Sequence, residues 1–311
     1  MECFVGIDVA QATLAIAVRP SREAWTVAND AADHAALAAR LTPLAPTLIV
    51  LEGTGGLEQP VAAALADAEL PVRIVNARQV RDFAKGVGRL AKTDPIDAAV
   101  LAHFAEVVRP VVRPLPDAAA SDLKALLSRR RQVVALRVAE TNRRTRALAV
   151  VRPSLDRSIA AMESEQTALD TEIAARIAAD PDWAAKAAAL RTVPGIGVGT
   201  ATLLLAALPE LGTLSRQAVA ALARVAPFNR DSGRSQGPAT IRGGRREVRT
   251  ALWMATIAAV RHNPTIAAFH ARLRAQHKPP KVARIACLRK LLTILNALLR
   301  DGTTWDDAFA A

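Results

Sequence analysis

Four carboxylic acids carry the clearest chemical signal in this sequence. Asp94 and Asp97 flank Pro95 and Ile96, and they open a stretch that is helical in pattern up to about Val108. Proline is favoured in the first turn of a helix, so this order predicts that Asp94 directly precedes the helix and that the two carboxylates lie one turn apart on one side. Acids also cap ordinary helix starts, so the motif alone does not establish a catalytic site.

The other two acids end apolar strand patterns. Asp8 follows the run Cys3–Ile7, and Glu52 follows the run Thr47–Leu51. Open α/β sheets place ligands and metals at the C-terminal tips of their strands. We therefore expect all four acids to converge on one edge of a sheet.

Converging carboxylates imply a metal-dependent reaction on phosphate. Carboxylates this close repel each other unless divalent cations neutralise them, and hard oxygen ligands suit Mg²⁺ or Mn²⁺. Two such ions can hold the attacking and the leaving oxygen of a phosphodiester. The acids Asp8, Glu52, Asp94 and Asp97 are therefore our candidate metal ligands and catalytic residues.

The elements that must position these acids follow a recognisable order. The patterns predict strands over 2–8, 13–19, 25–28, 47–51 and 71–75, and helices over 31–41, 57–68 and from about 78. Three meandering strands are followed by helix, strand, helix, strand and helix. This order matches the ribonuclease-H-like (RuvC-like) fold, a mixed five-stranded sheet with acids on the first strand, the fourth strand and a late helix.

Charge and pattern divide the chain into three regions. Residues 1–112 form the predicted α/β domain with net charge −3, and residues 113–190 form a helical coiled-coil region with net charge +3. Residues 191–311, a mainly helical domain, hold 18 basic and 6 acidic residues, a net charge of +12. An excess of this size indicates an anionic partner, and a nucleic-acid backbone is the usual one. With ten aromatic residues in the chain, phosphate contacts rather than base stacking must supply the affinity.

The middle region predicts an antiparallel helical pair that also dimerises. Its arginines crowd the first half, at Arg129, Arg130, Arg131, Arg137, Arg143, Arg144 and Arg146. Seam positions spaced three and four apart follow at Ile159, Met162, Gln166, Leu169 and Ile173. We expect the arginine-rich arm to touch nucleic acid.

No apolar run is long enough to span a membrane, and no basic-then-apolar leader opens the chain. Cys3 and Cys287 form no Cys-x-x-Cys motif, which argues against a zinc module or a disulfide framework. We expect a cytoplasmic protein without a membrane partner.

The segment Val193-Pro194-Gly195-Ile196-Gly197 lies between two helical patterns and predicts a helix-hairpin-helix element. Its glycines let backbone N–H groups at a helix start approach a DNA phosphate without reading bases. We therefore take Gly195 and Gly197 as candidate nucleic-acid contacts, although a plain helical corner has the same pattern.

Residues 227–238 are a run of turn-forming residues, followed by a predicted helix over 245–260 with Arg245 and Arg249 on one face. Ser232 stands in this loop, in an Asp-Ser-Gly sequence that is also typical of a plain turn. Arg230, Arg234 and Arg245 are near it in sequence and are candidates to hold a scissile phosphate, and Arg249 is a further nucleic-acid contact.

Together, these motifs resemble the DEDD transposases of bacterial insertion sequences, the IS110 family. The resemblance rests on the four acids, the Val-Pro-Gly-Ile-Gly element, and the segment Pro-Phe-Asn-Arg-Asp-Ser-Gly with the later Gly-Gly-Arg, in this order over nearly the whole chain. It implies a RuvC-like domain, a coiled-coil region and a C-terminal transposase domain.

The resemblance also implies a mechanism. Members of the family are recombinases that use the four acids with divalent metal and a serine of the C-terminal domain, guided by a structured RNA from their element. Ser232 matches that serine, with Ser235 as the alternative, and attack would give a phosphoserine intermediate. The chain has no tyrosine, which excludes a phosphotyrosine intermediate. Strand exchange cuts four strands, so we expect a homodimer or homotetramer.

Two other functions stay open from the sequence. One is a RuvC-like nuclease or junction resolvase that uses metal and water, with Ser232 as a simple turn residue. The other is a nucleic-acid-binding protein without catalytic activity, whose acids only cap helices and strand ends.

Overall fold

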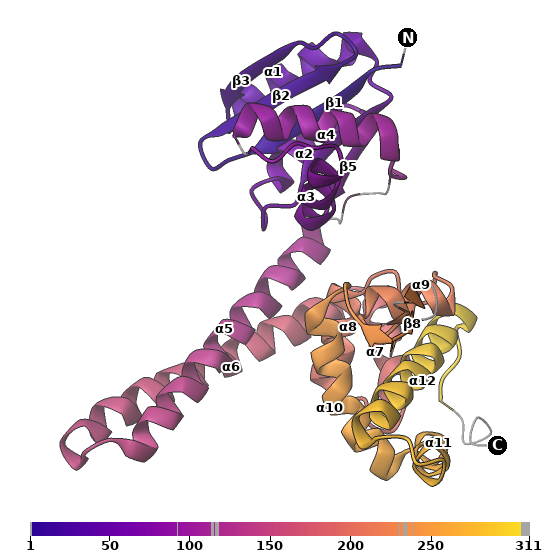
Figure 1. The fold of residues 1–311 in the computed structure, drawn as a ribbon. Coiled ribbons are helices and arrows are strands. Elements are labelled where there is room, and N and C mark those ends of the chain that lie inside the picture. Colours follow the sequence, from indigo (N-terminus) through magenta and orange to yellow (C-terminus); the bar gives the residue numbers. More distant parts are fainter. Residues whose placement is uncertain are drawn as a thin grey trace. The chain divides into compact units, whose positions relative to one another are not determined.

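The computed structural model describes residues 2–91, 93–112, 115, 118–229, 231–232, 235–237 and 239–305. The chain forms two compact units, Met1–Pro116 and Asp117–Ala311 (Figure 1). Of the helical region predicted over 113–190, residues from 117 onward fall within the second unit together with the C-terminal helices. A boundary between them at residue 190 stays a prediction. In the described residues no helix is both long and apolar enough to cross a membrane.

The first unit is built on a mixed five-stranded sheet, as predicted. Its strands are β1 (Phe4–Val9), β2 (Thr13–Arg19), β3 (Ala24–Ala28), β4 (Leu48–Glu52) and β5 (Val72–Val75). Their order across the sheet is β3-β2-β1-β4-β5. The first three strands are antiparallel neighbours, whereas β1, β4 and β5 run parallel. The carboxyl ends of β1 and β4 therefore meet at one edge.

Helices cover both faces of this sheet. Alternate residues of β1 point to opposite faces, as in any strand. Val5, Ile7 and Val9 pack against α1 (Ala31–Leu41) and α2 (Gln59–Asp67). On the other face, Phe4 packs against α3 (Ala77–Gly86) and α4 (Asp94–Val108). A short 3-10 turn, η1 (Thr42–Leu44), follows α1.

The helix α4 lies directly on the sheet because small residues line the contact. A side chain at Gly6 would collide with the backbone of α4 at Ala98, Leu101 and Ala102. Two alanines of β2 complete this layer, at Ala15 and Ala17. Glycine at position 6 therefore allows the close approach of α4.

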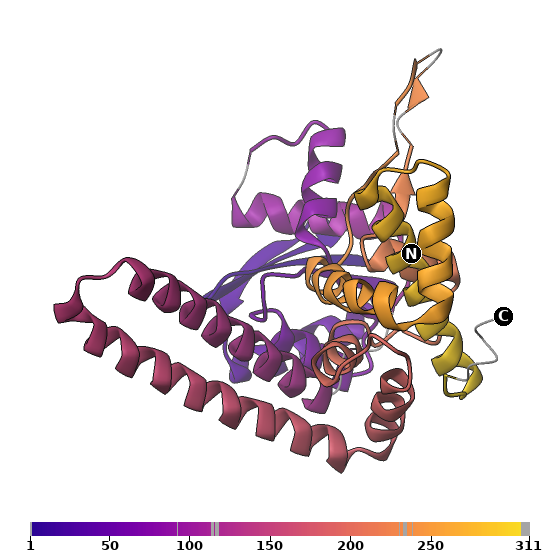
Figure 2. The same ribbon diagram turned by 90° about the horizontal axis from the view of Figure 1, so that it is seen from below.

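In the second unit, α5 (Ala118–Arg146) and α6 (Arg152–Ala179) are joined by the turn η2 (Ala149–Val151) and lie side by side as an antiparallel pair (Figures 1 and 2). Of the predicted seam, Leu169 and Ile173 are buried, with Ile177 one turn further. Ion pairs join the two helices at seven-residue intervals, namely Arg130 with Asp170, Arg137 with Glu163, and Arg144 with Asp156. These three arginines have acidic partners within the pair, and contact of the arginine-rich arm with nucleic acid stays a prediction.

The remaining helices share one core. They are α7 (Pro181–Arg191), α8 (Val198–Ala207), α9 (Arg216–Leu222), α10 (Arg246–His262), α11 (Pro264–Ala275) and α12 (Pro280–Asp301). Six buried residues of α12 lie in this core, from Cys287 to Leu298. The buried Asn296 side chain of α12 accepts from the Gly212 N–H and donates to the Leu214 carbonyl, which fixes the loop between α8 and α9.

The segment expected to be a loop over 227–238 contains strands. β6 (Pro227–Phe228) pairs with β9 (Thr240–Ile241), and β7 (Asp231–Ser232) pairs with β8 (Ser235–Gln236), both antiparallel. We call residues 227–241 the β arm, and Figure 2 shows it extending away from the helices of its unit. The strands are only two residues long, so they give no periodic apolar pattern from which they could be predicted.

Candidate active site

The first turn of α4 lies over the carboxyl end of β1. Near the start of β1, Arg19, which is paired with Phe4, forms an ion pair of 2.6 Å with Glu106 in the last turns of α4. Further along the strand, Gly6 meets Ala98 and Ala102. The helix therefore runs antiparallel to the strand, and its first turn, with Asp97, comes to the end of β1 that carries Asp8.

Asp8 and Glu52 lie on neighbouring strands and on the same face. The parallel register of β1 and β4 pairs Gly6 with Val50 and Ile7 with Leu51, so Asp8 and Glu52 follow as the next pair. Neighbouring strands are about 4.8 Å apart. Asp8 points to the same face as Gly6, and Glu52 to the same face as Val50, which is the face covered by α3 and α4. The predicted convergence of these two acids follows from the register.

Glu52 and Asp97 line one open groove of about 510 Å³. Ala77, Val80, Ala84 and Val100 supply apolar lining between α3 and α4. The remaining lining comes from charged side chains of α3, namely Arg78, Arg81, Asp82 and Lys85. The groove thus places two of the predicted catalytic acids beside the basic side chains of α3. A helix was predicted here, but its basic side chains were not predicted to lie near the acids.

Asp94 is placed differently from its predicted position. The helix α4 begins at Asp94, with Thr93 as the residue before it, so Asp94 is the first helical residue rather than the cap. Its side chain is exposed, whereas Asp97 is half-buried and lies in the groove. Lys92, in the connection before α4, lies outside the described residues.

The acids are suited to a divalent cation because their donors are carboxylate oxygens and because Asp8 and Glu52 lie at the carboxyl ends of neighbouring strands. Asp8, Glu52 and Asp97 offer only oxygen donors, which Mg²⁺ and Mn²⁺ prefer. Within the described part of the chain, however, no three His, Cys, Asp or Glu side chains are grouped closely enough to hold a metal ion. Asp8 and Glu52 end neighbouring strands and Asp97 lines the groove with Glu52, but the described acids do not form a closed ligand cluster in the structure of the chain alone.

A buried carboxylate fixes the loop after Glu52. Glu58 is only 5% exposed, and it accepts hydrogen bonds from the Thr54 N–H at 3.1 Å, the Thr54 hydroxyl at 3.0 Å and the Gly56 N–H at 2.8 Å. Burial alone raises the pKa of Glu58, but the hydrogen bonds to the ionised form outweigh it and leave that pKa below its ordinary value. Glu58 is a buried anchor of the 53–58 loop, and sequence reasoning missed it.

The backbones of the two candidate serines are paired in the β arm. Ser232 of β7 is paired with Ser235 of β8, and Ser232 is exposed. The flanking candidates Arg230 and Arg234 lie outside the described residues. The structure therefore gives the backbone pairing of the serines, and the phosphate-binding role of the two arginines stays a prediction.

Arg245 has an internal partner that differs from the predicted phosphate contact. Its guanidinium donates to both carboxylate oxygens of Glu210, at 2.5 and 2.7 Å, and to the Ala207 carbonyl at 3.0 Å. This bidentate pair joins the start of α10 to the end of α8 and stabilises the fold of the unit. Arg249, one turn further along α10, is half-exposed and stays a candidate contact.

The two glycines of the predicted helix-hairpin-helix have different surroundings. Gly195 has φ +103° and lies against Ala259 of α10, where a Cβ atom would come within 2.8 Å, so a packing contact requires glycine there. Gly197 precedes α8, and a Cβ atom there would meet open space. Of the two positions, Gly197 has the open surroundings that a phosphate contact needs.

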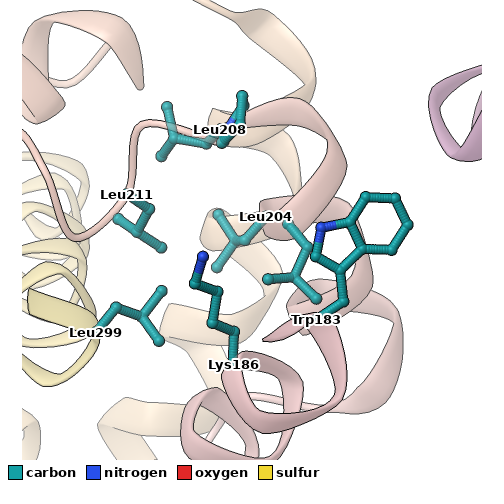
Figure 3. A pocket seen from close by; sticks show the side chains of 8 residues that line it. Trp183, Lys186, Leu204, Leu208, Leu211 and Leu299 are labelled. Atoms are coloured by element: carbon teal, nitrogen blue, oxygen red, sulfur yellow. The ribbon is translucent and has the colours of Figure 1, made fainter. Parts of the chain in front are cut away.

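A small pocket lies in the second unit and contains none of the predicted site residues. It has a volume of about 60 Å³ and is lined mainly by leucines, with Trp183 and Lys186 at its side (Figure 3). The Lys186 amine forms an ion pair with Asp182 at 2.6 Å.

Two family models match this chain. Residues 5–153 match a family described as transposase, and residues 187–271 match the transposase IS116/IS110/IS902 family. The chain is 31% identical to the pilin gene-inverting protein of Moraxella bovis over 263 residues, which cover 83% of this chain and 81% of that protein. The Moraxella lacunata protein of the same name has the same identity and coverage.

Two further similarities are more limited. An uncharacterised 43.6 kDa protein of insertion element IS110 from Streptomyces coelicolor is 31% identical over 54% of this chain and 41% of its own length. Among solved structures, Thermus thermophilus RuvC in complex with a Holliday junction substrate matches 37% of this chain and all of that chain, with 16% identity and a TM-score of 0.28. On the family matches and the Moraxella relatives, this chain belongs to the IS110 family of transposases.

Proposed function

We propose that this transposase cuts and rejoins DNA strands with Asp8, Glu52, Asp94 and Asp97 as metal-binding acids and Ser232 as the nucleophile. The observation that carries the proposal is the groove at the carboxyl edge of the sheet, which Glu52 and Asp97 line together, with Asp8 next to Glu52 in register. DNA is the substrate that a transposase acts on, and the basic C-terminal third suits its backbone.

The acids would bind Mg²⁺ or Mn²⁺ when the enzyme is loaded. A bound divalent ion supplies charge neutralisation at the phosphate, which is the chemistry that carboxylates alone cannot provide. The chain itself orients the ligands, because β1 and β4 are buried strands and α4 is held against them by Gly6. Asp94, exposed at the helix start, would complete the set from the solvent side.

In the proposed reaction, the Ser232 hydroxyl oxygen bonds to the scissile phosphorus while the ester bond to the leaving strand breaks. The serine proton is transferred through solvent to the leaving oxygen. The phosphoserine ester conserves the free energy of the broken phosphodiester bond. A hydroxyl of a second strand can therefore displace the serine and rejoin DNA without an external energy source. The exposed position of Ser232 on the β arm is suited to this attack.

We also propose that a structured RNA from the element guides the enzyme and that two or four copies act together. The family resemblance supports both statements. The stretch between Arg261 and Arg300 contains nine basic residues and no acid, and it supplies surface for the backbone of either nucleic acid.

The test is denaturing electrophoresis of the purified protein with Mg²⁺, labelled element-junction DNA and RNA transcribed from the flank of the element. We expect a protein-DNA adduct that survives denaturation and is absent from Ser232→Ala. Ser235→Ala is the matched control, because its serine lies opposite in the same hairpin, and it should retain the adduct.

Other outcomes would assign the alternatives. An adduct lost only in Ser235→Ala would identify Ser235 as the nucleophile. Cleavage without an adduct, equal in all three proteins, would mean a nuclease that uses metal and water. Binding without any cleavage would mean a protein that only binds nucleic acid.

A further inference from the structure

The helix α3 presents a row of basic side chains to the groove that holds Glu52 and Asp97. Arg78, Arg81 and Lys85 are spaced three and four residues apart, so they lie on one side of the helix, and all three line the groove. The adjoining side of α3 carries Val80 and Ala84, which are buried in the core and also line the groove. The basic row is therefore the solvent-facing side of a helix that is anchored to the sheet.

The structure fixes this row relative to the acids. β5 pairs with β4 so that Val75 lies opposite Glu52, and Val75 is followed within two residues by the start of α3. On the α4 side, the Phe83 ring makes edge contacts with His103 and Phe104, with ring centroids 5.2 and 5.4 Å apart. Sheet and helix contacts thus hold both walls of the groove at a set spacing.

The three basic side chains have different local contacts. Arg81 donates to the Leu90 carbonyl at 3.0 Å, and it thereby holds the connection that leads from α3 to α4. Arg78 lies 3.7 Å from Asp82 in a highly exposed pair, which contributes little binding energy. The Lys85 side chain is exposed in the last turn of the helix. Arg78 and Lys85 can therefore turn toward a ligand, whereas Arg81 also has a positioning role.

We propose that Arg78 and Lys85 bind the phosphate backbone of a DNA strand and seat it in the groove, with the phosphate to be cut next to Glu52 and Asp97. A groove with acids on one wall and cations on the other suits a polyanion whose reacting phosphate faces the acids and whose neighbouring phosphates face the cations. This inference rests on the proposed function, because it takes the acids as the cleavage site.

The test compares the native chain with the double variant Arg78→Gln/Lys85→Gln and with Arg22→Gln. Arg22 is the matched control, since it is exposed in the turn between β2 and β3, and β3 is at the opposite edge of the sheet from β5. Affinity for junction DNA is measured against salt, and cleavage is measured at low and at saturating DNA. A DNA with uncharged methylphosphonates beside the scissile phosphate is tested in parallel.

We expect the double variant to bind DNA roughly 10- to 100-fold more weakly, with a salt slope reduced by about two, and to recover cleavage at saturating DNA. Methylphosphonates should weaken the native chain and Arg22→Gln by a similar factor, but the double variant much less. Equal affinity, salt slope and methylphosphonate sensitivity in all three proteins would overturn the inference. A loss of affinity confined to the RNA would also overturn it, because the occupant would then not be DNA.

Failure of the proposed function has a separate signature. If the native chain binds junction DNA but never cuts it, the groove is not an active site. If it binds and cuts while the double variant behaves identically, the active site stands and only the role of α3 is removed.

Discussion

The cysteines of this chain are poor candidates for the nucleophile because their thiols are kept protonated. Burial raises the pKa of the Cys287 thiol to about 11, although nearby Lys290 opposes the shift, so this thiol stays protonated at neutral pH. Burial also raises the pKa of Cys3, with a contribution from Glu23. Because the sequence lacks tyrosine, a phosphotyrosine intermediate is excluded as well, and Ser232 or a water molecule stays our proposed nucleophile.

The ionised carboxylate of Glu58 should stabilise the folded chain in a pH-dependent way. Its lowered pKa means that the ionised carboxylate stabilises the folded chain above about pH 4.3, the ordinary value for glutamate, and that this contribution is lost as the pH falls through the lower folded pKa. We expect Glu58→Gln to lower the free energy of unfolding by about 2 kcal/mol at pH 7, because hydrogen bonds to a charged group are lost. Thermal unfolding at several pH values measures this.

The pH dependence is the critical part of that measurement. The difference in melting temperature between the native chain and Glu58→Gln should shrink as the pH falls below about 4.3. A difference that stayed constant over this range would mean that the carboxylate charge does not anchor the loop after Glu52.

Side chains with distant partners were the least predictable from sequence. Asp8 and Glu52 were identified because each ends an apolar strand, which is a local signal. The Arg245 pair with Glu210 joins residues 35 positions apart, and no local pattern indicates it. The basic row on α3 had a readable signal in its helical spacing, but the proximity of that row to the acids depends on the pairing of β4 with β5.

At the scale of elements, the position of α4 decides the geometry of the candidate site. The helix brings Asp97 to the groove only because β1 lacks a side chain at Gly6. Gly6→Ala would force α4 away from the sheet, since the atoms in the way belong to backbone that cannot rotate aside. We expect a loss of about 3 kcal/mol in the free energy of unfolding, together with reduced cleavage at temperatures where the variant is folded.

Gly86→Ala is the control for that variant. A Cβ atom at Gly86 would meet open space at the end of α3, so its melting temperature should stay within about 2 °C of the native value. If Gly6→Ala were as stable and as active as Gly86→Ala, close contact between α4 and β1 would not be what positions Asp97.

The helices of the α5–α6 pair could be predicted from sequence, but the ion pairs between them could not. Two long helices were predicted from pattern, and the structure has them as α5 and α6. The partner of the arginines was not predicted, because each ion pair matches residues 12 to 40 positions apart across the turn. Charge that looks available in the sequence is therefore partly neutralised within the fold.

For the molecule as a whole, the charge distribution predicts how nucleic acid is bound. The net charge of +12 equals that of the C-terminal third alone, and few aromatic side chains are present for stacking. We expect affinity for DNA to fall at least about 100-fold between about 50 and 200 mM salt, because many counterions are released on binding. Fluorescence anisotropy with labelled DNA measures it, and a flat salt profile would contradict a backbone-dominated interface.

If DNA is cut in the groove lined by Glu52 and Asp97, one set of acid variants will lose cleavage and keep DNA binding. Strand cleavage and DNA binding are measured for Glu52→Gln, Asp97→Asn and Asp82→Asn. Asp82 is the matched control, since it lines the same groove from α3 but belongs to no predicted ligand set. Glu52→Gln and Asp97→Asn should cut at least about 100-fold more slowly and bind DNA within about threefold of the native chain. Asp82→Asn should cut at close to the native rate, and native cleavage by Glu52→Gln and Asp97→Asn would contradict the account.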